Sequence, residues 1–381
     1  MLVVLALGGG LLVAWLFHLL RVPDVAGLVL YGVLVGPLWH LIQIRPDSVG
    51  VVNLLSLGAA FILFLGGRQI SLTLLNRVKW TVSRLATFGV AITIVILLIV
   101  THLVLGTAWS VSLGIAITMA NTDPATIIPV MQRVGVKPLL RITVETEAAF
   151  NDVMSVLILT VMVMLTHHGV TSSGFLITVA GLAVAVAGGL GVGRIARYLE
   201  PRLAGHSVWL SWLLIVLTPV VVFFMAQTFG GAGLLAPFVA GIGSGSPKFG
   251  DSALPVEKLL STGIRVVIFV LTGALLPLPL MLHHWLILLT VTVALMVVAR
   301  PLTVWAATFS LPSEIWHRRD RLFMMWVRET GVISLVLAMN LGQAYPQYAH
   351  MILAVVAMSV VVTVAVQATT TGWVARKLRV T

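Results

Sequence analysis

Long apolar runs fill almost the whole chain, and only short polar connections separate them. An α-helix needs about 20 apolar residues to cross the hydrocarbon core of a bilayer. On that criterion we expect membrane-spanning helices at residues 2–20, 25–43, 50–66, 85–105, 108–132, 140–165, 174–197, 206–228, 231–246, 256–278, 283–309, 319–342 and 348–375. The pattern predicts an all-α polytopic membrane protein of about 13 transmembrane helices, with residues 1–381 in a single membrane domain.

Composition and charge agree with a membrane protein and exclude other classes. Hydrophobic residues make up 59% of the chain and charged residues 9%, which is unlike a soluble globular domain. The net charge of +11 does not indicate a nucleic-acid partner, because the basic residues lie in the connections between apolar runs. Basic connections stay cytoplasmic, and their alternation along the chain places the N-terminus outside and the C-terminus in the cytoplasm. The chain has no cysteine, which excludes disulfides and thiolate chemistry.

Several acidic residues lie within or beside apolar segments rather than in connections. They are Asp123, Glu145, Glu147, Asp152 and Glu329. A charged side chain at the bilayer centre costs about 2.5 kcal/mol or more, so each of them needs a partner, water or a transported ion. Structural pairing is the favoured interpretation for Glu147, because Arg300 is a basic residue inside an apolar segment and requires a counter-charge.

Two apolar segments are interrupted at corresponding places along the chain. Pro124 breaks segment 108–132, where it removes a backbone donor and frees carbonyl groups of the preceding turn for a cation or for polar side chains. The polar run 328–331 interrupts segment 319–342. These breaks predict two discontinuous helices.

The positions of the breaks suggest an internal symmetry. Residues 1–166 and 206–376 form two approximate halves, and a linker helix at 174–197 reverses the orientation of the second half. Such inverted repeats are typical of secondary transporters, whose binding site lies near the membrane midplane where two discontinuous helices cross.

The most specific motifs resemble a known family. They are Thr122-Asp123-Pro124 and Glu145-x-Glu147-x-x-x-Asn151-Asp152. Residues 20–37, 233–241 and 268–273 provide further, less specific matches. Together these patterns resemble the cation:proton antiporter superfamily, and within it the electroneutral sodium/proton exchanger branch that includes archaeal and bacterial NhaP proteins. The resemblance covers nearly the whole chain.

This resemblance implies roles for individual residues. Asp152 would bind the transported alkali cation or the proton, and the residues that would shape or hold this site are Asp123, Thr122 and Asn151. Glu147 and Arg300 would form a structural ion pair between helices. Residues that would support the site from behind its ligands are Glu145, Arg328 and Glu329.

The resemblance also implies the setting in which the protein works. It predicts a homodimer in the lipid bilayer of a prokaryotic inner membrane, with monovalent cations and protons as its partners and no cofactor. The chain departs from the branch's pattern at three places. Ala148 stands one turn before Asp152 where a serine is common, residues 66–69 lack a common acid, and residues 328–331 contain an additional one.

A mechanism follows from electrostatics. Burial favours the protonated form of a carboxyl group, whereas a nearby cation favours the ionised form, so a proton and a metal ion compete for Asp152. If the loaded site crosses between two access states and the bare charge does not, the result is exchange. Because Asn151 is neutral, the site has one charge to neutralise, which predicts electroneutral one-for-one exchange. Oxygen ligands suit a hard cation, with sodium favoured and lithium or potassium still open.

Other function classes remain as alternatives at this point. A sodium-coupled solute symporter and a cation channel are also built from broken helices with polar centres. An enzyme is not expected, because the sequence contains neither a zinc-binding His-Glu-x-x-His nor a paired-aspartate or serine-histidine arrangement in a suitable context.

Overall fold

The computed structural model describes residues 5–19, 24–42, 49–69, 80–123, 127–168, 171–230, 232–245, 254–311 and 316–381. Within these ranges the chain is helical and contains no strand. The α-helices are α2 (Gly10–Leu19), α3 (Asp24–Val33), α4 (Val49–Gln69), α6 (Val90–Leu105), α7 (Trp109–Ala120), α8 (Ile127–Val134), α9 (Pro138–His168), α10 (Ser172–His206), α11 (Val208–Gly230), α12 (Leu235–Ser244), α13 (Leu254–Ala274), α14 (Leu278–His283), α15 (Trp285–Val293), α16 (Arg300–Thr308), α17 (Arg318–Trp326), α18 (Val332–Ala344), α19 (Ala349–Thr363) and α20 (Thr369–Leu378).

Short π-helical and 3-10 segments adjoin several of these helices. They are the π-helices η1 (Leu5–Gly9), η2 (Leu34–Leu38), η3 (Leu85–Gly89), η4 (Ala294–Ala299) and η6 (Val364–Ala368), and the 3-10 helix η5 (Pro346–Tyr348). The π-helix η4 connects α15 to α16 without a loop, so Arg300 begins α16 inside a long apolar rod.

Seven of the described helical stretches are long and apolar enough to cross a membrane by length and composition. They are Gly50–Arg68, Trp80–Leu105, Pro138–Thr166, Ser172–Leu203, Trp209–Thr228, Trp285–Thr308 and Pro346–Leu378. Each apolar segment expected from the sequence contains a helix or two consecutive helices. The all-helical class is therefore observed, while the number of membrane crossings stays a prediction.

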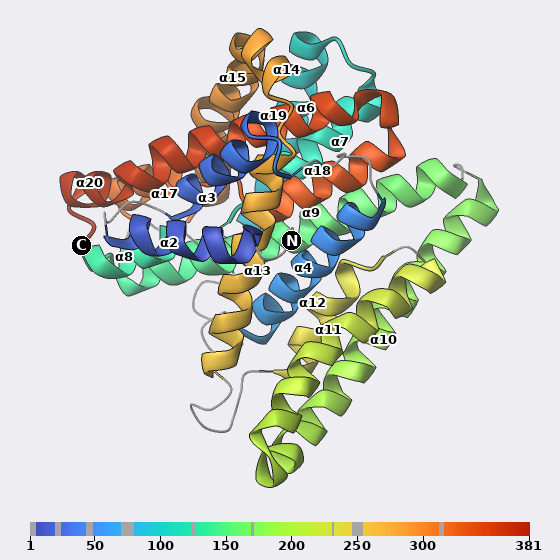
Figure 1. The fold of residues 1–381 in the computed structure, drawn as a ribbon. Coiled ribbons are helices and arrows are strands. Elements are labelled where there is room, and N and C mark those ends of the chain that lie inside the picture. The colour runs from blue at the N-terminus through green and yellow to red at the C-terminus, as the bar shows by residue number, and fades with distance from the viewer. Residues whose placement is uncertain are drawn as a thin grey trace. The chain divides into compact units, whose positions relative to one another are not determined.

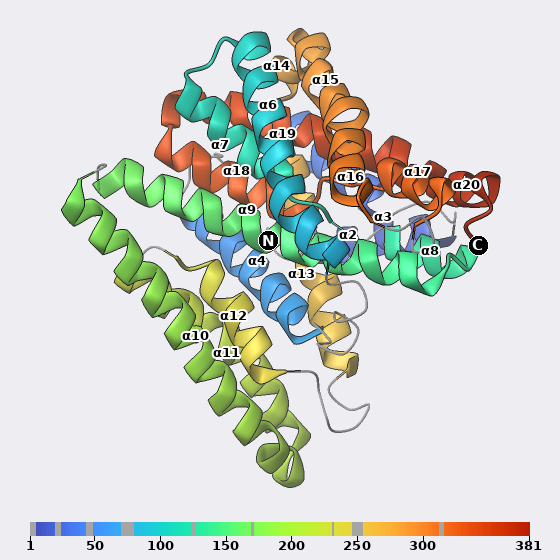
Figure 2. The same ribbon diagram turned by 180° about the vertical axis from the view of Figure 1, so that it is seen from behind.

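The chain divides into two compact units, which are described separately. Unit 1 comprises residues 1–51, 74–155 and 266–381, and unit 2 comprises residues 52–73 and 156–265. In unit 1, α7 packs against α6, α18 and α19 (Figure 2). A buried apolar cluster joins α8, α9, α16, α17 and the end of the chain, and it includes Met131, Leu140, Val304, Phe323 and Val380. This cluster fixes the helices that carry the interrupted segments.

Unit 2 is built around α10, which packs along both α11 and α12 (Figure 1). Glycines permit close packing of α4 on α12, because a Cβ atom on Gly67 would lie 2.4 Å from the Phe238 carbonyl oxygen. The next residue, Arg68, is 2% exposed and forms a 2.9 Å ion pair with Glu200 of α10. The ion pair thus joins α4 to α10, and a 3.5 Å hydrogen bond from Arg68 Nη1 to Ser244 Oγ connects α4 to α12.

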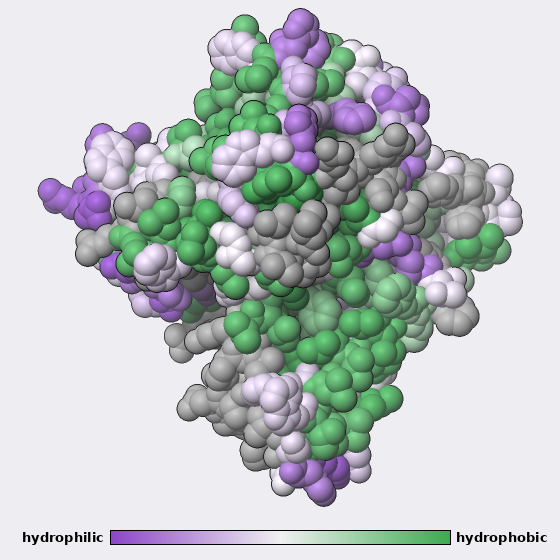
Figure 3. Space-filling model, viewed as in Figure 1, coloured by the Kyte–Doolittle hydropathy of each residue, from purple (hydrophilic) through white to green (hydrophobic). Residues whose placement is uncertain are grey.

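The outer surface of unit 2 is apolar. Large hydrophobic side chains on α10 and α11 are exposed, including Leu176 at 66% and Trp209 at 73%, and hydrophobic surface dominates the visible part of this unit (Figure 3). Helices with apolar exposed faces are typical of proteins that contact lipid.

Candidate functional site

The two interrupted segments meet through their backbones within unit 1. Helix α7 ends at Ala120, and Asn121 is extended with φ −70° and ψ 165°. Helix α17 ends at Trp326, and α18 begins at Val332. The backbone N–H of Asp123 donates a 2.9 Å hydrogen bond to the carbonyl oxygen of Glu329. The two non-helical stretches therefore lie side by side, as the sequence pattern predicted for the two breaks.

The first break begins earlier than the proline suggests. Pro124 lies outside the described residues, and the preceding residues 121–123 are already non-helical. The residue before a proline is disfavoured in the α region, which accounts for Asp123. The further unwinding to Asn121 accompanies a long-range contact, in which the Ser334 hydroxyl donates to the Asn121 side-chain oxygen.

Gly331 and Asp123 explain how the two breaks come so close. A Cβ atom on Gly331 would lie 2.0 Å from the Cβ of Asp123, so only glycine permits this approach. The backbone N–H of Val332 donates to Asp123 Oδ2 at 3.3 Å. A carboxylate at a helix N-terminus satisfies a free N–H group and is stabilised by the helix dipole. Asp123 therefore caps α18.

Arg328 binds the end of the opposite helix. Its Nη2 donates to the carbonyl oxygens of Met119 at 2.8 Å and Asn121 at 3.1 Å. The last carbonyl groups of a helix lack intrahelical partners and carry partial negative charge. The carbonyls freed by the first break are thus satisfied by a guanidinium group that is 3% exposed.

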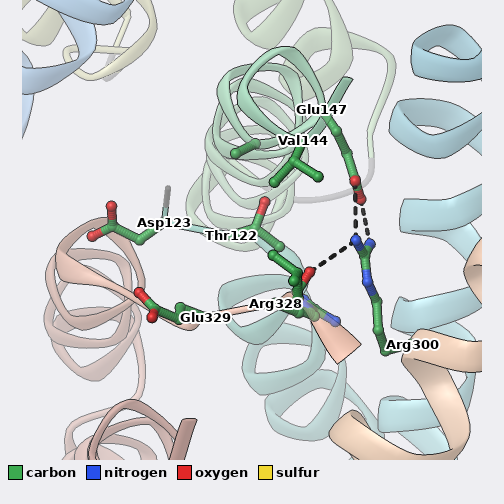
Figure 4. Close-up of a pocket in the computed structure, with 9 residues that line it drawn as sticks. Thr122, Asp123, Val144, Glu147, Arg300, Arg328 and Glu329 are labelled. Atoms are coloured by element: carbon green, nitrogen blue, oxygen red, sulfur yellow. Dashed lines mark hydrogen bonds and ion pairs between the residues drawn. The ribbon is translucent and has the colours of Figure 1, made fainter. Parts of the chain in front are cut away.

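Arg300 and Glu147 form a buried ion pair. Both side chains are 2% exposed and their groups are in contact, with Arg300 Nη2 3.1 Å from Glu147 Oε2. The guanidinium also donates to the carbonyl oxygens of Met324 at 2.9 Å and Val327 at 3.1 Å. Figure 4 shows the ion pair between Arg300 and Glu147. Arg300 thereby joins α9 to the C-terminal end of α17, and it occupies both oxygens of Glu147.

Asn151 is oriented by two hydrogen-bond acceptors on one side. Its Nδ2 donates to Thr122 Oγ1 and to Glu147 Oε1, both at 3.3 Å. A carboxylate paired with arginine can only accept hydrogen bonds, so the amide nitrogen must face Glu147. The amide oxygen of Asn151 consequently points elsewhere, is buried, and has no hydrogen-bond partner among the described residues.

Asp152 follows on the same helix, α9. The residue is half-buried, and its Oδ1 is fully buried without a hydrogen-bond partner in the described part of the chain. The backbone N–H of Thr122 lies within hydrogen-bonding reach of the carboxylate, and the negative charge of Asp123 acts on it. Unlike Glu147, Asp152 thus has an oxygen available to a ligand.

Glu329 adds a further carboxylate to the crossing. It is 2% exposed, its Oε1 has no partner among the residues that the structure describes, and it interacts electrostatically with Asp123. The side chains of Asp123 and Glu329 point to the same side, away from the Glu147–Arg300 pair (Figure 4). Glu145, in contrast, is half-buried on α9 and interacts with Arg141.

A small cavity lies among these groups. Thr122, Asp123, Arg328 and Glu329 line it together with the Glu147–Arg300 pair. The space open to the centre of a water molecule is ≈ 10 Å³, which is about what one water molecule needs. The site is therefore polar but narrow in this conformation.

Comparison with known proteins places the chain in a family. The family model described as "Sodium/hydrogen exchanger, transmembrane" matches residues 3–377. The chain belongs to the sodium/hydrogen exchanger family. The resemblance inferred from the motifs is confirmed by this match.

Individual exchangers are similar over most of the chain. The Na(+)/H(+) antiporter 1 of Methanocaldococcus jannaschii is 30% identical over 362 residues, which cover 89% of this chain and 82% of that protein. The K(+)/H(+) antiporter NhaP2 of Shewanella oneidensis is 28% identical over 287 residues, which cover 73% of this chain and 49% of that protein. The chain thus spans about half the length of the K(+)/H(+) relatives.

The fold is also shared with a solved exchanger structure. The sodium proton antiporter MjNhaP1 from Methanocaldococcus jannaschii at pH 8 matches with a TM-score of 0.81 and 25% sequence identity. The match covers 99% of this chain and 97% of that one. The protein is therefore an integral membrane protein with the helical fold of these antiporters.

The structure of this exchanger brings most of the sequence-predicted residues to one place. Seven of them lie at the crossing, namely Thr122, Asp123, Glu147, Asn151, Arg300, Arg328 and Glu329. Asp152 adjoins them through Thr122. Glu145, Asn151 and Asp152 do not line the cavity. Sequence reasoning missed Ser334, which bonds to Asn121 although the two residues are 213 positions apart in the sequence. No distinctive local pattern surrounds Ser334.

Proposed function

We propose that this exchanger moves a monovalent cation against a proton by alternating access, with Asp152 as the group that carries one or the other. The observation that supports this proposal is the buried, unpartnered Oδ1 of Asp152 beside the likewise unpartnered Oδ1 of Asn151. A buried polar oxygen without a partner is destabilising. A cation or a proton at Asp152 removes that penalty, and the two exclude each other at one oxygen.

Asp152 is a better carrier than the neighbouring Glu147. Both oxygens of Glu147 are engaged by the Arg300 guanidinium, so a cation would have to displace an arginine. Removing one partner of a buried ion pair costs about 3–5 kcal/mol, which is too much for a step repeated in every cycle. Glu147 and Arg300 therefore serve as a structural pair.

The other residues hold the site. Thr122 presents its backbone amide to Asp152 and its hydroxyl to Asn151. Asp123 contributes negative charge beside Asp152 and caps α18. Arg328 and Glu329 support the crossing from the second interruption, and Glu145 supports α9 at its turn with Arg141.

Stoichiometry and ion choice follow from the same ligands. A single ionised Asp152 beside a neutral Asn151 supports electroneutral exchange of one cation for one proton. The ligands are oxygens, which suit alkali cations. Sodium is our first candidate because similar proteins include a sodium/proton antiporter, and potassium is the second because others are K(+)/H(+) antiporters.

The wider architecture belongs to this proposal as well. We place two inverted repeats at residues 1–166 and 206–376 about a linker helix at 174–197, with about 13 membrane crossings. We place the N-terminus outside and the C-terminus in the cytoplasm, and we expect a homodimer in a prokaryotic inner membrane.

Proteoliposomes with an internal pH dye test the proposal. Sodium, lithium or potassium is added to wild type and to Asp152→Asn, with the membrane potential clamped at two values. We expect cation-dependent proton flux in wild type that is unchanged by the potential and absent from Asp152→Asn, whose folding is checked by size-exclusion chromatography and thermal unfolding. Cation-dependent proton flux in a folded Asp152→Asn variant would refute the assignment of the carrier.

A further inference from the structure

Buried hydroxyl groups on the helices of this protein mostly bond to the carbonyl one turn earlier. Thr101 donates to Leu97 at 2.6 Å, and Thr178 donates to Gly174 at 2.9 Å. On α9 itself, Thr143 donates to Leu139 at 2.8 Å. This back-bonding is the usual way in which a helical serine or threonine satisfies its hydroxyl away from water.

Ser155 on α9 departs from this pattern. Its side chain is 0% exposed, and its Oγ makes no hydrogen bond to any described residue, not even to the carbonyl of Asn151 one turn earlier. A fully buried hydroxyl without a partner needs an explanation such as a missing water or ion. Ser211, Thr272 and Thr330 share the property. No acidic residue lies within one turn of Ser211 or Thr272, and Thr330 lies in the non-helical stretch between α17 and α18 and not on a helix.

Helix geometry places Ser155 next to the proposed carrier. At about 100° per residue, Ser155 projects between Asn151 and Asp152 and lies one turn further along α9. Side chains three and four residues apart on a helix have Cβ atoms about 5–6 Å apart. The three oxygens that lack partners on this turn, Asn151 Oδ1, Asp152 Oδ1 and Ser155 Oγ, thus share one face of α9.

The surroundings of these three oxygens account for their lack of hydrogen-bond partners among the described residues. Asn151 is held by its amide nitrogen to Thr122 and Glu147, which leaves its oxygen unused. Asp152 and Ser155 do not bond to each other, although carboxylates readily accept from hydroxyl groups. On the other side of Asp152, Ala148 offers no side-chain oxygen one turn earlier. On this turn of α9, Ser155 therefore supplies the side-chain oxygen next to those of Asp152 and Asn151.

We infer that Ser155 is a ligand of the transported cation and helps to determine ion affinity and selectivity. Its hydroxyl oxygen contributes a neutral ligand beside the carboxylate of Asp152 and the amide oxygen of Asn151, and this set suits a desolvated alkali cation. A proton on Asp152 requires no such set. Ser155 therefore acts on cation binding and not on proton binding. The inference rests on the proposed exchange at Asp152 and names a further ligand of that site.

The test compares Ser155→Ala with Ser155→Thr in proteoliposomes. Ser155→Ala should raise the KM for sodium by roughly tenfold, leave the maximal rate within about twofold, and change the ratio of sodium, lithium and potassium KM values. Ser155→Thr should restore the wild-type KM because it restores the hydroxyl. Ser211→Ala is the matched control, since it also removes a buried hydroxyl without a described partner, and it should leave the KM unchanged.

A second measurement separates binding from structure. Thermal unfolding in detergent should show sodium stabilising wild type, with Ser155→Ala needing roughly tenfold more sodium for the same rise in Tm and keeping the sodium-free Tm of wild type. An unchanged sodium KM in Ser155→Ala overturns the inference, whether or not the sodium-free Tm is lowered.

The proposed function has its own control in the same experiment. A wild type without cation-dependent proton flux, or a folded Asp152→Asn variant that retains it, overturns the exchange mechanism at Asp152 and the role of Ser155 with it. When wild type exchanges and Asp152→Asn does not, a wild-type KM in Ser155→Ala overturns only the role of Ser155.

Discussion

The backbone N–H of Asp123 donates a 2.9 Å hydrogen bond to the carbonyl of Glu329. This bond joins the two interruptions, and the Asp123 carboxylate accepts a second bond from Val332 at the start of α18. Asp123 therefore has three roles. Its backbone bonds to Glu329, its carboxylate accepts from Val332, and its negative charge acts on Asp152. Substitutions can separate these roles.

Asp123→Asn and Asp123→Ala both remove the negative charge, but the two variants should differ in stability. The amide oxygen of asparagine can still accept from Val332, whereas alanine removes the cap, which costs about 0.5–2 kcal/mol. Thermal unfolding should therefore rank wild type and Asp123→Asn above Asp123→Ala. Both variants should show a raised sodium KM in flux assays, because each removes negative charge beside Asp152. Equal stability of the two variants would argue against the capping role.

Gly331→Ala should disrupt the crossing. Its Cβ would lie 2.0 Å from the Cβ of Asp123, and relief requires a backbone shift, for which overpacking costs of about 1–3 kcal/mol or more are typical. We expect a lower Tm and greatly reduced exchange.

Gly191→Ala on α10 is the matched control for this substitution. Nothing lies within 4 Å of a Cβ atom at Gly191, and the change should stabilise the protein by about 0.4–1 kcal/mol. Similar Tm values for the two alanine variants would contradict the close approach at Gly331.

The Glu147–Arg300 pair should behave as a coupled unit. Glu147→Gln or Arg300→Gln alone should destabilise by about 3–5 kcal/mol, because each leaves a buried charge without its partner. The double variant should lose less unfolding free energy than the sum of the losses in the two single variants. Denaturant unfolding in detergent measures all three.

The Lys137–Asp320 pair provides a comparison for that cycle. Its lysine side chain is 43% exposed, and Nζ lies 2.9 Å from Asp320 Oδ1. Asp320 is 4% exposed, but its Oδ2 also accepts from the backbone N–H of His317. Lys137→Met should therefore cost less than either substitution in the Glu147–Arg300 pair. A strictly additive Glu147–Arg300 cycle would show that the pair contributes no coupling energy.

Glu329→Gln should stabilise the cation-free protein and weaken sodium binding. The wild-type carboxylate is 2% exposed with an unpartnered oxygen and lies near the charge of Asp123, and an amide of the same shape removes a buried like-charge repulsion. We expect a higher Tm without sodium and a sodium KM raised roughly three- to tenfold. A lower Tm with an unchanged KM would instead indicate a purely structural role.

Local pattern was sufficient for much of the fold and for the choice of candidate residues. Apolar runs predicted most of the described helices, because a helix in lipid must be apolar along its length. The short helix α14 falls between the expected segments 256–278 and 283–309. Acids inside those runs singled out Asp123, Glu147, Asp152 and Glu329, because their presence in lipid requires a reason. Arg300 stood out by the same argument, which led to its pairing with Glu147.

Contacts between distant residues were beyond a local reading. Arg328 bonds to Met119 and Asn121 at the end of α7, which lie 209 and 207 positions away in the sequence. No local sequence pattern predicts these bonds. At the end of α7, Asn121 is bonded by Ser334, which lies on another helix. Ser155 has the sequence of an ordinary helical serine, and only the absence of its back-bond within the described structure distinguishes it.

Arg328 and Arg300 connect the two interruptions to neighbouring helices. Arg328 extends from the second interruption to the end of α7, while Arg300 extends from α16 to the end of α17 and to Glu147 on α9. Moving either interruption alone would strip a buried guanidinium of its acceptors. The crossing is therefore mechanically stiff, and a cycle that preserves these bonds must carry both interruptions together as one body.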